Sequence, residues 1–167
     1  IVSDGCGTAI VTDPKKVEGL CGRISGVIKT SPLRTVISLV GESNVLDTKT
    51  CEINQIKGLE KAIAKGHKRI AVTISNANEI KEIRKIEKKN SCEVYIFGVH
   101  TSGASKEDAE LFLEYGDIIT ACMSDNIKEL ANKKGIYTTK TKIPIYGPSE
   151  KGKKAIELRL KEIQNKK

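Results

Sequence analysis

The sequence has no tryptophan and contains only two phenylalanines and four tyrosines among its 167 residues. Arginine is also scarce, because 24 of the 29 basic residues are lysine and only 5 are arginine. Proteins that read nucleic acids usually combine arginine with aromatic side chains on which bases stack. We therefore interpret the net charge of +8 as a lysine-rich solvated surface, and we predict no nucleic-acid partner.

Long apolar runs are missing as well. None approaches the roughly 20 residues that a membrane-spanning helix requires, and the chain does not open with a basic-then-apolar secretory leader. The composition, 38% hydrophobic and 30% charged, is that of a folded chain rather than a disordered one. We expect a cytoplasmic protein without a membrane partner, formed by a single α/β domain over residues 1–167.

The five cysteines show neither the spacing of a zinc module nor an even number that would suggest a disulfide framework. We predict no metal site and identify no cofactor. Cys6 and Cys21 differ from the others because both lie among glycines. Thiolate ligation by this pair stays open as an alternative, although two thiols are too few for a complete ligand set.

Residues 51–167 read as regular β–α repeats, whereas residues 1–50 are irregular and rich in glycine. Apolar runs that begin near residues 70, 94, 117 and 143 predict four strands, with helical patterns between and after them. Crossovers of this length produce parallel neighbours with right-handed connections. The sequence therefore predicts a three-layer, Rossmann-like, mostly parallel sheet with helices on both faces, with Pro144 marking an edge strand.

Small polar residues follow each predicted strand, at the carboxyl ends where open parallel sheets bind ligands. They are Ser75 and Asn76; His100, Thr101 and Ser102; Ser124 and Asp125; and Gly147, Pro148 and Ser149. His100 is the most specific of them and the best candidate for a catalytic residue, since imidazole can bind a ligand, hold a metal or move a proton. An ordinary hydrogen-bonding role at the rim is an equal alternative. Whether the protein is an enzyme stays open.

Three glycine-rich or small polar segments near the start form the other candidate region: residues 3–8, 22–26 and 30–32. They contain neither a P-loop nor a dinucleotide fingerprint, so tight turns are the alternative to a ligand loop. Arg23 is the rare arginine among them, and its planar guanidinium suits a carboxylate or phosphate. The predicted ligand-binding residues are Asp4, Gly5, Gly7, Thr8, Arg23, Ser25, Thr30, Ser31, His100, Thr101 and Ser102.

Four segments together carry a family resemblance: Asp4-Gly5-Cys6-Gly7-Thr8, Gly22-Arg23-Ile24-Ser25-Gly26 with Thr30-Ser31-Pro32, residues 95–103 (YIFGVHTSG) and residues 117–122 (DIITAC). In this order they resemble the archaeal family called methanogenesis marker protein 8. The resemblance implies an archaeal, cytoplasmic protein associated with methanogenesis, and it supplies no catalytic residues. Members of that family are typically longer at the N-terminus, and this chain begins with Ile1, so we expect a piece that lacks its N-terminal part.

Two hypotheses of function follow. The first is a small-molecule binding domain, with or without catalysis, in which Arg23 holds the negative group of an anionic ligand or cofactor and His100 polarises it or exchanges a proton. The second is a non-catalytic accessory or assembly protein whose basic surface docks on an acidic protein of the methanogenesis machinery. The oligomeric state is not predicted.

Overall fold

A computed structural model describes residues 1–20 and 32–165. The chain divides into two units. The first unit comprises residues 1–73 and 82–94, and the second comprises residues 74–81 and 95–167. Strands β3 (Arg69–Ile74) and β4 (Glu93–Gly98) therefore contribute residues to both units. The single domain expected from the sequence stays a prediction.

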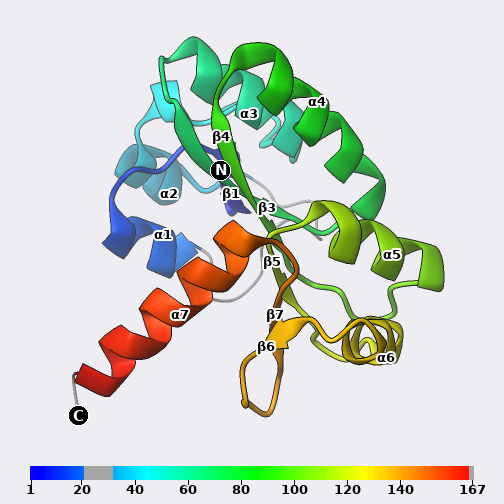
Figure 1. Cartoon of the computed structure of the whole chain (residues 1–167). Helices are drawn as coiled ribbons and strands as arrows, with labels where there is room; N and C mark the ends of the chain where they lie inside the picture. The colour runs from blue at the N-terminus through cyan, green and yellow to red at the C-terminus, as the bar shows by residue number, and fades with distance from the viewer. Residues whose placement is uncertain (21–31, 166–167) are drawn as a thin grey trace. The chain divides into compact units, whose positions relative to one another are not determined.

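The first unit is built on a two-stranded antiparallel hairpin near the N-terminus (Figure 1). Its elements are β1 (Val2–Asp4), β2 (Gly7–Ala9), α1 (Pro14–Leu20), α2 (Arg34–Val40), the 3₁₀ helix η1 (Glu42–Asn44), α3 (Gln55–Ala64) and most of α4 (Ile80–Asn90). Buried apolar side chains from β1, β2 and α2, such as Val2, Ala9 and Ile37, pack into one cluster with Val45. Burial of this cluster is what holds the short elements together.

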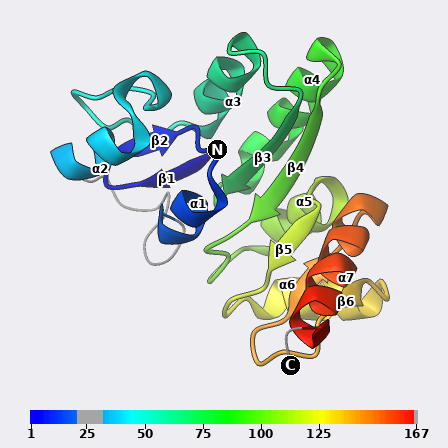
Figure 2. The same cartoon turned by 90° about the vertical axis from the view of Figure 1, so that its left-hand side faces the viewer.

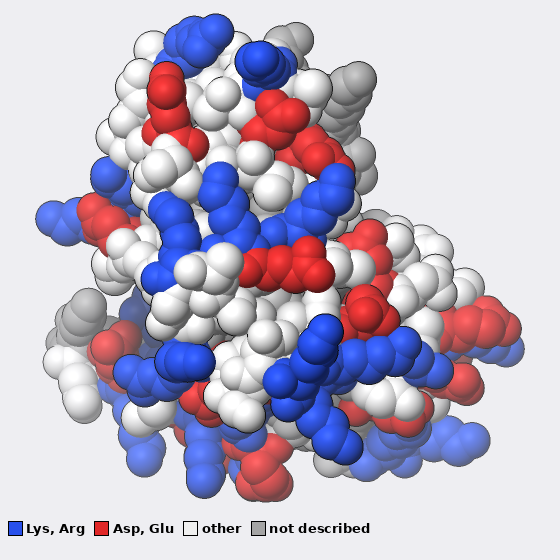
Figure 3. All heavy atoms as spheres, turned by 90° about the horizontal axis from the view of Figure 1, so that it is seen from above, with Lys and Arg blue, Asp and Glu red and all other residues white. Residues whose placement is uncertain are grey.

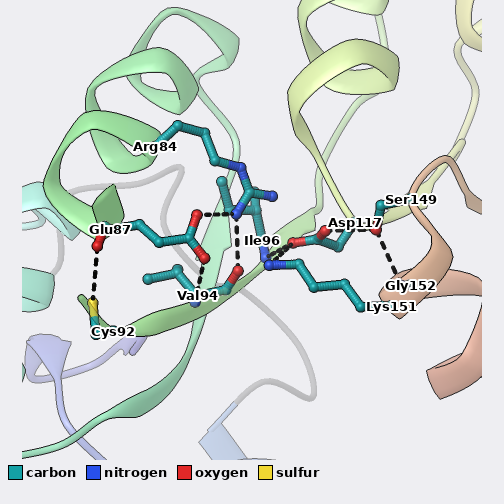
Figure 4. Close-up of polar contacts among 9 residues, drawn as sticks. All are labelled: Arg84, Glu87, Cys92, Val94, Ile96, Asp117, Ser149, Lys151 and Gly152. Atoms are coloured by element: carbon teal, nitrogen blue, oxygen red, sulfur yellow. Dashed lines mark hydrogen bonds and ion pairs between the residues drawn. The ribbon is translucent and has the colours of Figure 1, made fainter. Parts of the chain in front are cut away.

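Side chains of α4 also satisfy the backbone of β4 in this unit (Figure 4). Glu87 Oε1 accepts a hydrogen bond from Val94 N at 2.7 Å, and Arg84 donates to Val94 O at 2.9 Å. The same arginine pairs with Glu87 at 2.7 Å. The half-buried ion pair therefore provides partners for both polar groups of one strand residue, which burial would otherwise penalise.

The second unit packs helices on both sides of its strands. Its elements are η2 (Ala77–Glu79), α5 (Lys106–Tyr115), β5 (Ile118–Thr120), α6 (Asp125–Lys133), β6 (Tyr137–Thr138), β7 (Ile145–Gly147) and α7 (Glu150–Asn165). Figures 1 and 2 show α5 and α6 on one face of β5 and β7, and α7 on the opposite face. The buried side chains Phe112, Ile127 and Ile156 come from α5, α6 and α7, respectively.

The five-stranded sheet has the order β3-β4-β5-β7-β6 and is mixed. Strands β4 and β5 are parallel, whereas β7 runs antiparallel to both β5 and β6. The amides of Glu93 and Val99 donate to the carbonyls of Lys68 and Ile74, at 2.8 and 2.9 Å. Both bonds link residues 25 positions apart, and such a constant offset is typical of parallel neighbours.

The α/β class expected from the sequence is confirmed, but the mostly parallel, Rossmann-like sheet is not. The expected fourth parallel strand, β7, is antiparallel to β5. The reason is local: β6 precedes it, and residues 139–144 connect the two strands as a hairpin. So short a connection cannot form the crossover that parallel neighbours need.

Lysine and arginine alternate with acidic residues over the face that Figure 3 shows. The described helices also carry ion pairs one turn apart, such as Lys85 with Glu82 at 3.0 Å and Arg159 with Glu162 at 2.9 Å. Such exposed pairs contribute little to stability and are typical of a solvated surface. In the described part of the chain, no helix has the length and apolar character needed to cross a membrane.

Candidate functional site

The loops that follow β4 and β5 are joined by hydrogen bonds in the second unit. The buried Thr101 hydroxyl donates to Thr120 O at 2.6 Å, and Met123 N donates to Ser102 Oγ at 3.4 Å. Asn126 Nδ2 donates to Ala104 O at 2.8 Å. The carboxyl ends of these two parallel strands therefore form one connected rim, as the sequence predicts for them.

A cavity of about 260 Å³ lies at the ends of β3 and β4, lined by the loops that follow these strands and by residues of α5. Its lining residues are Ser75, Asn76, Ala77, Asn78, His100, Thr101, Ser102, Gly103, Ala104, Asp108 and Phe112. The three predicted residues His100, Thr101 and Ser102 are brought together with Ser75 and Asn76, which the sequence places at the end of the preceding strand. Polar groups surround the space, and the buried Phe112 contributes apolar surface.

His100 has a backbone that glycine would adopt more easily. Its φ angle is 53°, in the left-handed region, and its side chain is exposed. A left-handed conformation costs a non-glycine residue roughly 1–2 kcal/mol. Cys122, in the loop that follows β5, has a similar φ of 46°. Strain of this kind at a strand end motivates a functional hypothesis for His100, because an imidazole is retained where glycine would fit with less strain.

The first turns of η2 and α5 lie beside the cavity, and side chains cap both of them through hydrogen bonds. The side chain of Asn76 accepts a hydrogen bond from Asn78 N at 3.2 Å and donates to Glu79 at 3.1 Å. At the start of α5, Ser105 and Asp108 form a reciprocal capping box with bonds of 3.0 and 3.1 Å. The described lining contains neither Lys nor Arg, and Asp108 is its one carboxylate.

Asn78, Gly103 and Asp108 are among the lining residues that the sequence analysis did not identify as site residues. Each lies within the first turn of a helix or in the loop before it, and Asp108 is recognisable from the sequence only as a helix cap. The available signal is positional, since helices that follow neighbouring parallel strands begin at the same rim.

The remaining strand ends do not line the cavity. Ser124 is buried as the cap of α6 and accepts from Ile127 N at 3.3 Å. Ser149 lies at the opposite end of β5, where its hydroxyl donates to Asp117 at 2.6 Å. The expectation that Gly147, Pro148 and Ser149 share the rim is wrong because β7 is antiparallel, which places its carboxyl end beside the amino end of β5.

The first glycine-rich segment is packed inside the first unit. Gly5, Gly7 and Thr8 are buried, and Gly7 has a φ of 71°. A Cβ at Gly7 would lie 2.4 Å from the carbonyl of Cys51, so the close approach of two backbones requires glycine there.

The hydroxyl of Thr8 is likewise engaged within the protein. It donates to Gln55 Oε1 at 2.7 Å and accepts from Asn54 N at 2.8 Å. These contacts explain Gly7 and Thr8 without a ligand, as the tight-turn alternative predicts. A binding role for Gly5, Gly7 and Thr8 stays a prediction.

The other predicted residues fall into two groups. The backbone of Asp4 lies in β1, where it pairs with Gly7. Arg23, Ser25, Thr30, Ser31 and Cys21 lie outside the described residues. Because Asp4 to Thr8 and His100 to Ser102 belong to different units, one site formed by both stays a prediction.

The described cysteines Cys51, Cys92 and Cys122 are free thiols, and Cys6 is buried. Among residues 1–20 and 32–165, no group of three or more His, Cys, Asp or Glu side chains could hold a metal ion. Burial raises the pKa of the Cys51 thiol, and the negative charge of Asp47 adds to this. Burial and then Glu87 raise the pKa of Cys92 in the same direction.

These shifts predict an order of reactivity toward iodoacetamide. A raised pKa leaves less thiolate at a given pH, and only the thiolate reacts. We expect Cys122 to react first in the folded protein, Cys92 more slowly, and the buried Cys6 and Cys51 only after unfolding. Peptide mapping by mass spectrometry measures the order, with the protein in guanidinium as a control for intrinsic reactivity. Equal labelling of Cys51 and Cys122 in the folded protein would contradict it.

Residues 1–161 match a family described as uncharacterised proteins conserved in archaea, DUF2099. An uncharacterised protein of Methanocaldococcus jannaschii is 41% identical to this chain over 166 residues. That alignment covers 98% of this chain but 58% of the relative, so the chain spans little more than half of the relative's length. No solved structure matches the chain.

Proposed function

This chain belongs to DUF2099, the family of uncharacterised proteins conserved in archaea, and we propose that it binds a small anionic ligand or cofactor in the cavity beside His100. The observation that carries the proposal is the convergence of exposed His100 with Ser102, Asn76 and Asn78 around one polar cavity. Its volume of about 260 Å³ lies below the roughly 300–1,000 Å³ typical of sites for drug-sized ligands. A phosphate or a small carboxylate suits that size.

The electrostatics favour an anion of low charge. The N-termini of η2 and α5 direct partial positive charge toward the cavity, and imidazole adds a full charge when protonated. Asp108 supplies one opposing carboxylate, which already accepts a hydrogen bond from Ser105 N at 3.1 Å. His100 is the residue best suited to polarise the ligand or exchange a proton with it, if the site is catalytic.

The setting of the proposal is cytoplasmic and methanogenesis-associated. It is supported by the resemblance of the glycine-rich and strand-end motifs to methanogenesis marker protein 8. The proposal uses the ends of β3 and β4, whose constant hydrogen-bond offset is typical of parallel neighbours, and the three-layer, Rossmann-like sheet stays a prediction. Arg23, the contact predicted for the negative group, lies outside the described residues.

The second candidate is a non-catalytic accessory or assembly protein for the methanogenesis machinery. One observation favours it: an apolar side chain, Ile143, is 51% exposed directly after Lys142 in the connection from β6 to β7. Such a surface suits docking on an acidic protein better than it suits small-molecule binding.

The variant His100→Asn tests the first candidate. Asparagine tolerates the left-handed backbone but removes the imidazole, so stability is expected to change by less than about 0.5 kcal/mol. Binding of inorganic phosphate or acetate, followed by NMR chemical shifts of residues 75–78 and 100–104, is expected to weaken about tenfold or more. His67→Asn, in the other unit, is the matched control and should leave binding unchanged. Shifts that avoid the cavity, or equal affinities for His100→Asn and the parent protein, would refute the proposal.

A further inference from the structure

The connection between β6 and β7, residues 139–144, is held in one shape by its own threonines. We call it the lysine hairpin. The buried Thr139 hydroxyl lies 2.7 Å from the Thr141 hydroxyl and accepts from Ile145 N at 3.0 Å. Thr141 donates onward to Ile143 O at 2.6 Å. Both views show this segment as a loop that projects from the end of β6 and β7 (Figures 1 and 2).

The side chains at the tip of the lysine hairpin are ones that a solvated turn does not require. Lys140 and Lys142 are exposed, and Ile143 between Lys142 and Pro144 is 51% exposed. Pro144 fixes its own φ and removes a backbone donor. The threonine bonds and the proline hold Ile143 in a defined position before any partner arrives, which reduces the entropy lost on binding.

We propose that the lysine hairpin is a docking element for an acidic protein segment. Lys140 and Lys142 would pair with its carboxylates, and its apolar side chains would cover Ile143. An apolar centre with a charged rim is the usual anatomy of a protein–protein contact. Complementary charge supplies orientation and a faster association. This surface is separate from the residues that line the cavity beside His100, so the inference goes beyond the proposed ligand site.

A protein partner fits these residues better than a nucleic acid. The hairpin contains no arginine, and isoleucine cannot stack on a base as an aromatic ring does. Two tyrosines flank the hairpin in the chain: Tyr146 in β7 is buried, and Tyr137 in β6 has the ammonium of Lys153 5.8 Å from its ring centre. This cation occupies one face of the ring that a base would need.

Protection of the sheet edge is the competing explanation. Strand β6 ends the strand order, and lysine and proline near an edge discourage pairing with another chain. That role accounts for Lys140, Lys142 and Pro144. It does not account for the half-exposed Ile143, whose backbone carbonyl accepts a hydrogen bond from Thr141.

Titration with synthetic peptides of about twelve residues tests the proposal. One peptide alternates glutamate with leucine, and its partner has serine in place of every leucine. Fluorescence anisotropy gives the affinities, and NMR shifts of residues 137–145 locate the contact. We expect the leucine peptide to bind more tightly than the serine peptide. Ile143→Ser should lower the affinity for the leucine peptide about fivefold and leave the affinity for the serine peptide unchanged. Lys140→Glu with Lys142→Glu is expected to abolish binding of both peptides.

Matched controls use equally exposed residues elsewhere. Leu158→Ser removes another exposed apolar side chain of the same unit, and Lys88→Glu with Lys89→Glu reverses two exposed lysines of α4. Both should leave the peptide affinities within twofold of the parent protein. Equal effects of Ile143→Ser and Leu158→Ser would overturn the proposal. An RNA oligonucleotide that binds more tightly than the peptides, with an affinity unchanged by Ile143→Ser, would also overturn it. Self-association of the Lys140→Glu, Lys142→Glu variant that still binds the peptides would overturn it as well.

Discussion

Replacing Gly152 with alanine is expected to lower the free energy of unfolding by about 3 kcal/mol, because the added methyl group has no space. Gly152 is buried in the first turn of α7. A Cβ there would lie less than 2 Å from the backbone oxygen of Asp117 and 2.6 Å from its carbonyl carbon. These are backbone atoms at the start of β5, so relief requires α7 or the strand to move. Urea denaturation followed by circular dichroism measures the loss.

The sign of this change is informative because helix propensity acts the other way. In an unobstructed helix, replacing glycine with alanine stabilises by about 1 kcal/mol. Lys154→Ala, at an exposed position in the same helix, controls for changes in helical propensity and should shift stability by less than about 0.5 kcal/mol. A stabilised Gly152→Ala protein would mean that α7 does not rest on Asp117 as described.

The three apolar runs that became β3, β4 and β5 could be predicted from sequence because each is rich in hydrophobic residues, although burial alternates along β3 and β4 rather than covering both faces. The direction of β7 could not. It depends on whether the preceding segment crosses over or turns back, and β6, with only Tyr137 and Thr138, is too short to leave a periodic signal. The edge position predicted from Pro144 is wrong, because β7 lies between β5 and β6 and the proline stands just before the strand, where it removes no ladder bond of β7.

The candidate site was predictable to a similar degree. The rule that ligands bind beyond carboxyl ends of parallel strands located His100, Thr101 and Ser102 beside Asn76. The glycines near the N-terminus show the limit of this reasoning. A glycine that lets a ligand approach and a glycine that lets Cys51 approach both lack a Cβ, so sequence alone cannot distinguish them.

Sequence reasoning also did not identify a role for Asp117, which looks like the polar start of an apolar strand. In the structure its side chain is fully buried. Its Oδ2 accepts from Ile96 N at 2.8 Å, and its Oδ1 accepts from the Ser149 hydroxyl at 2.6 Å (Figure 4). The ammonium of Lys151 lies 3.6 Å from the same carboxylate. The carboxylate thus links β4 and β5 to the start of α7.

Lys151 has a second contact that keeps it in place. Its ammonium lies 5.1 Å from the centre of the Tyr95 ring, and its side chain is 28% exposed. A partly buried cation between a ring and a carboxylate is stabilised by both. Removing the carboxylate would leave the ammonium with less compensation and would leave the Ile96 amide without its side-chain acceptor. The resulting loss in the free energy of unfolding should therefore exceed the contribution of any one of these contacts.

We expect Asp117→Ala to lower the free energy of unfolding by about 3–5 kcal/mol, the range found when one partner of a buried ion pair is removed. Asp117→Asn keeps one acceptor oxygen and should cost less, and Ser149→Ala should cost about 1–2 kcal/mol. Asp125→Ala provides the control, since that carboxylate is 83% exposed beside Lys128 and should contribute less than about 1 kcal/mol. Urea denaturation of all four variants gives the comparison.

The two largest predictions also test each other, because Gly152 and Asp117 meet at one contact. If α7 is held by this contact, the combined variant Asp117→Ala, Gly152→Ala should lose less than the sum of the two single losses, since the second substitution acts on a contact already broken. Additive losses, or a cost for Asp117→Ala no greater than that of Asp125→Ala, would show that the carboxylate does not anchor the helix. In that case the burial of Asp117 would need another explanation, and a ligand-related role for Lys151 and Ser149 would become the first to test.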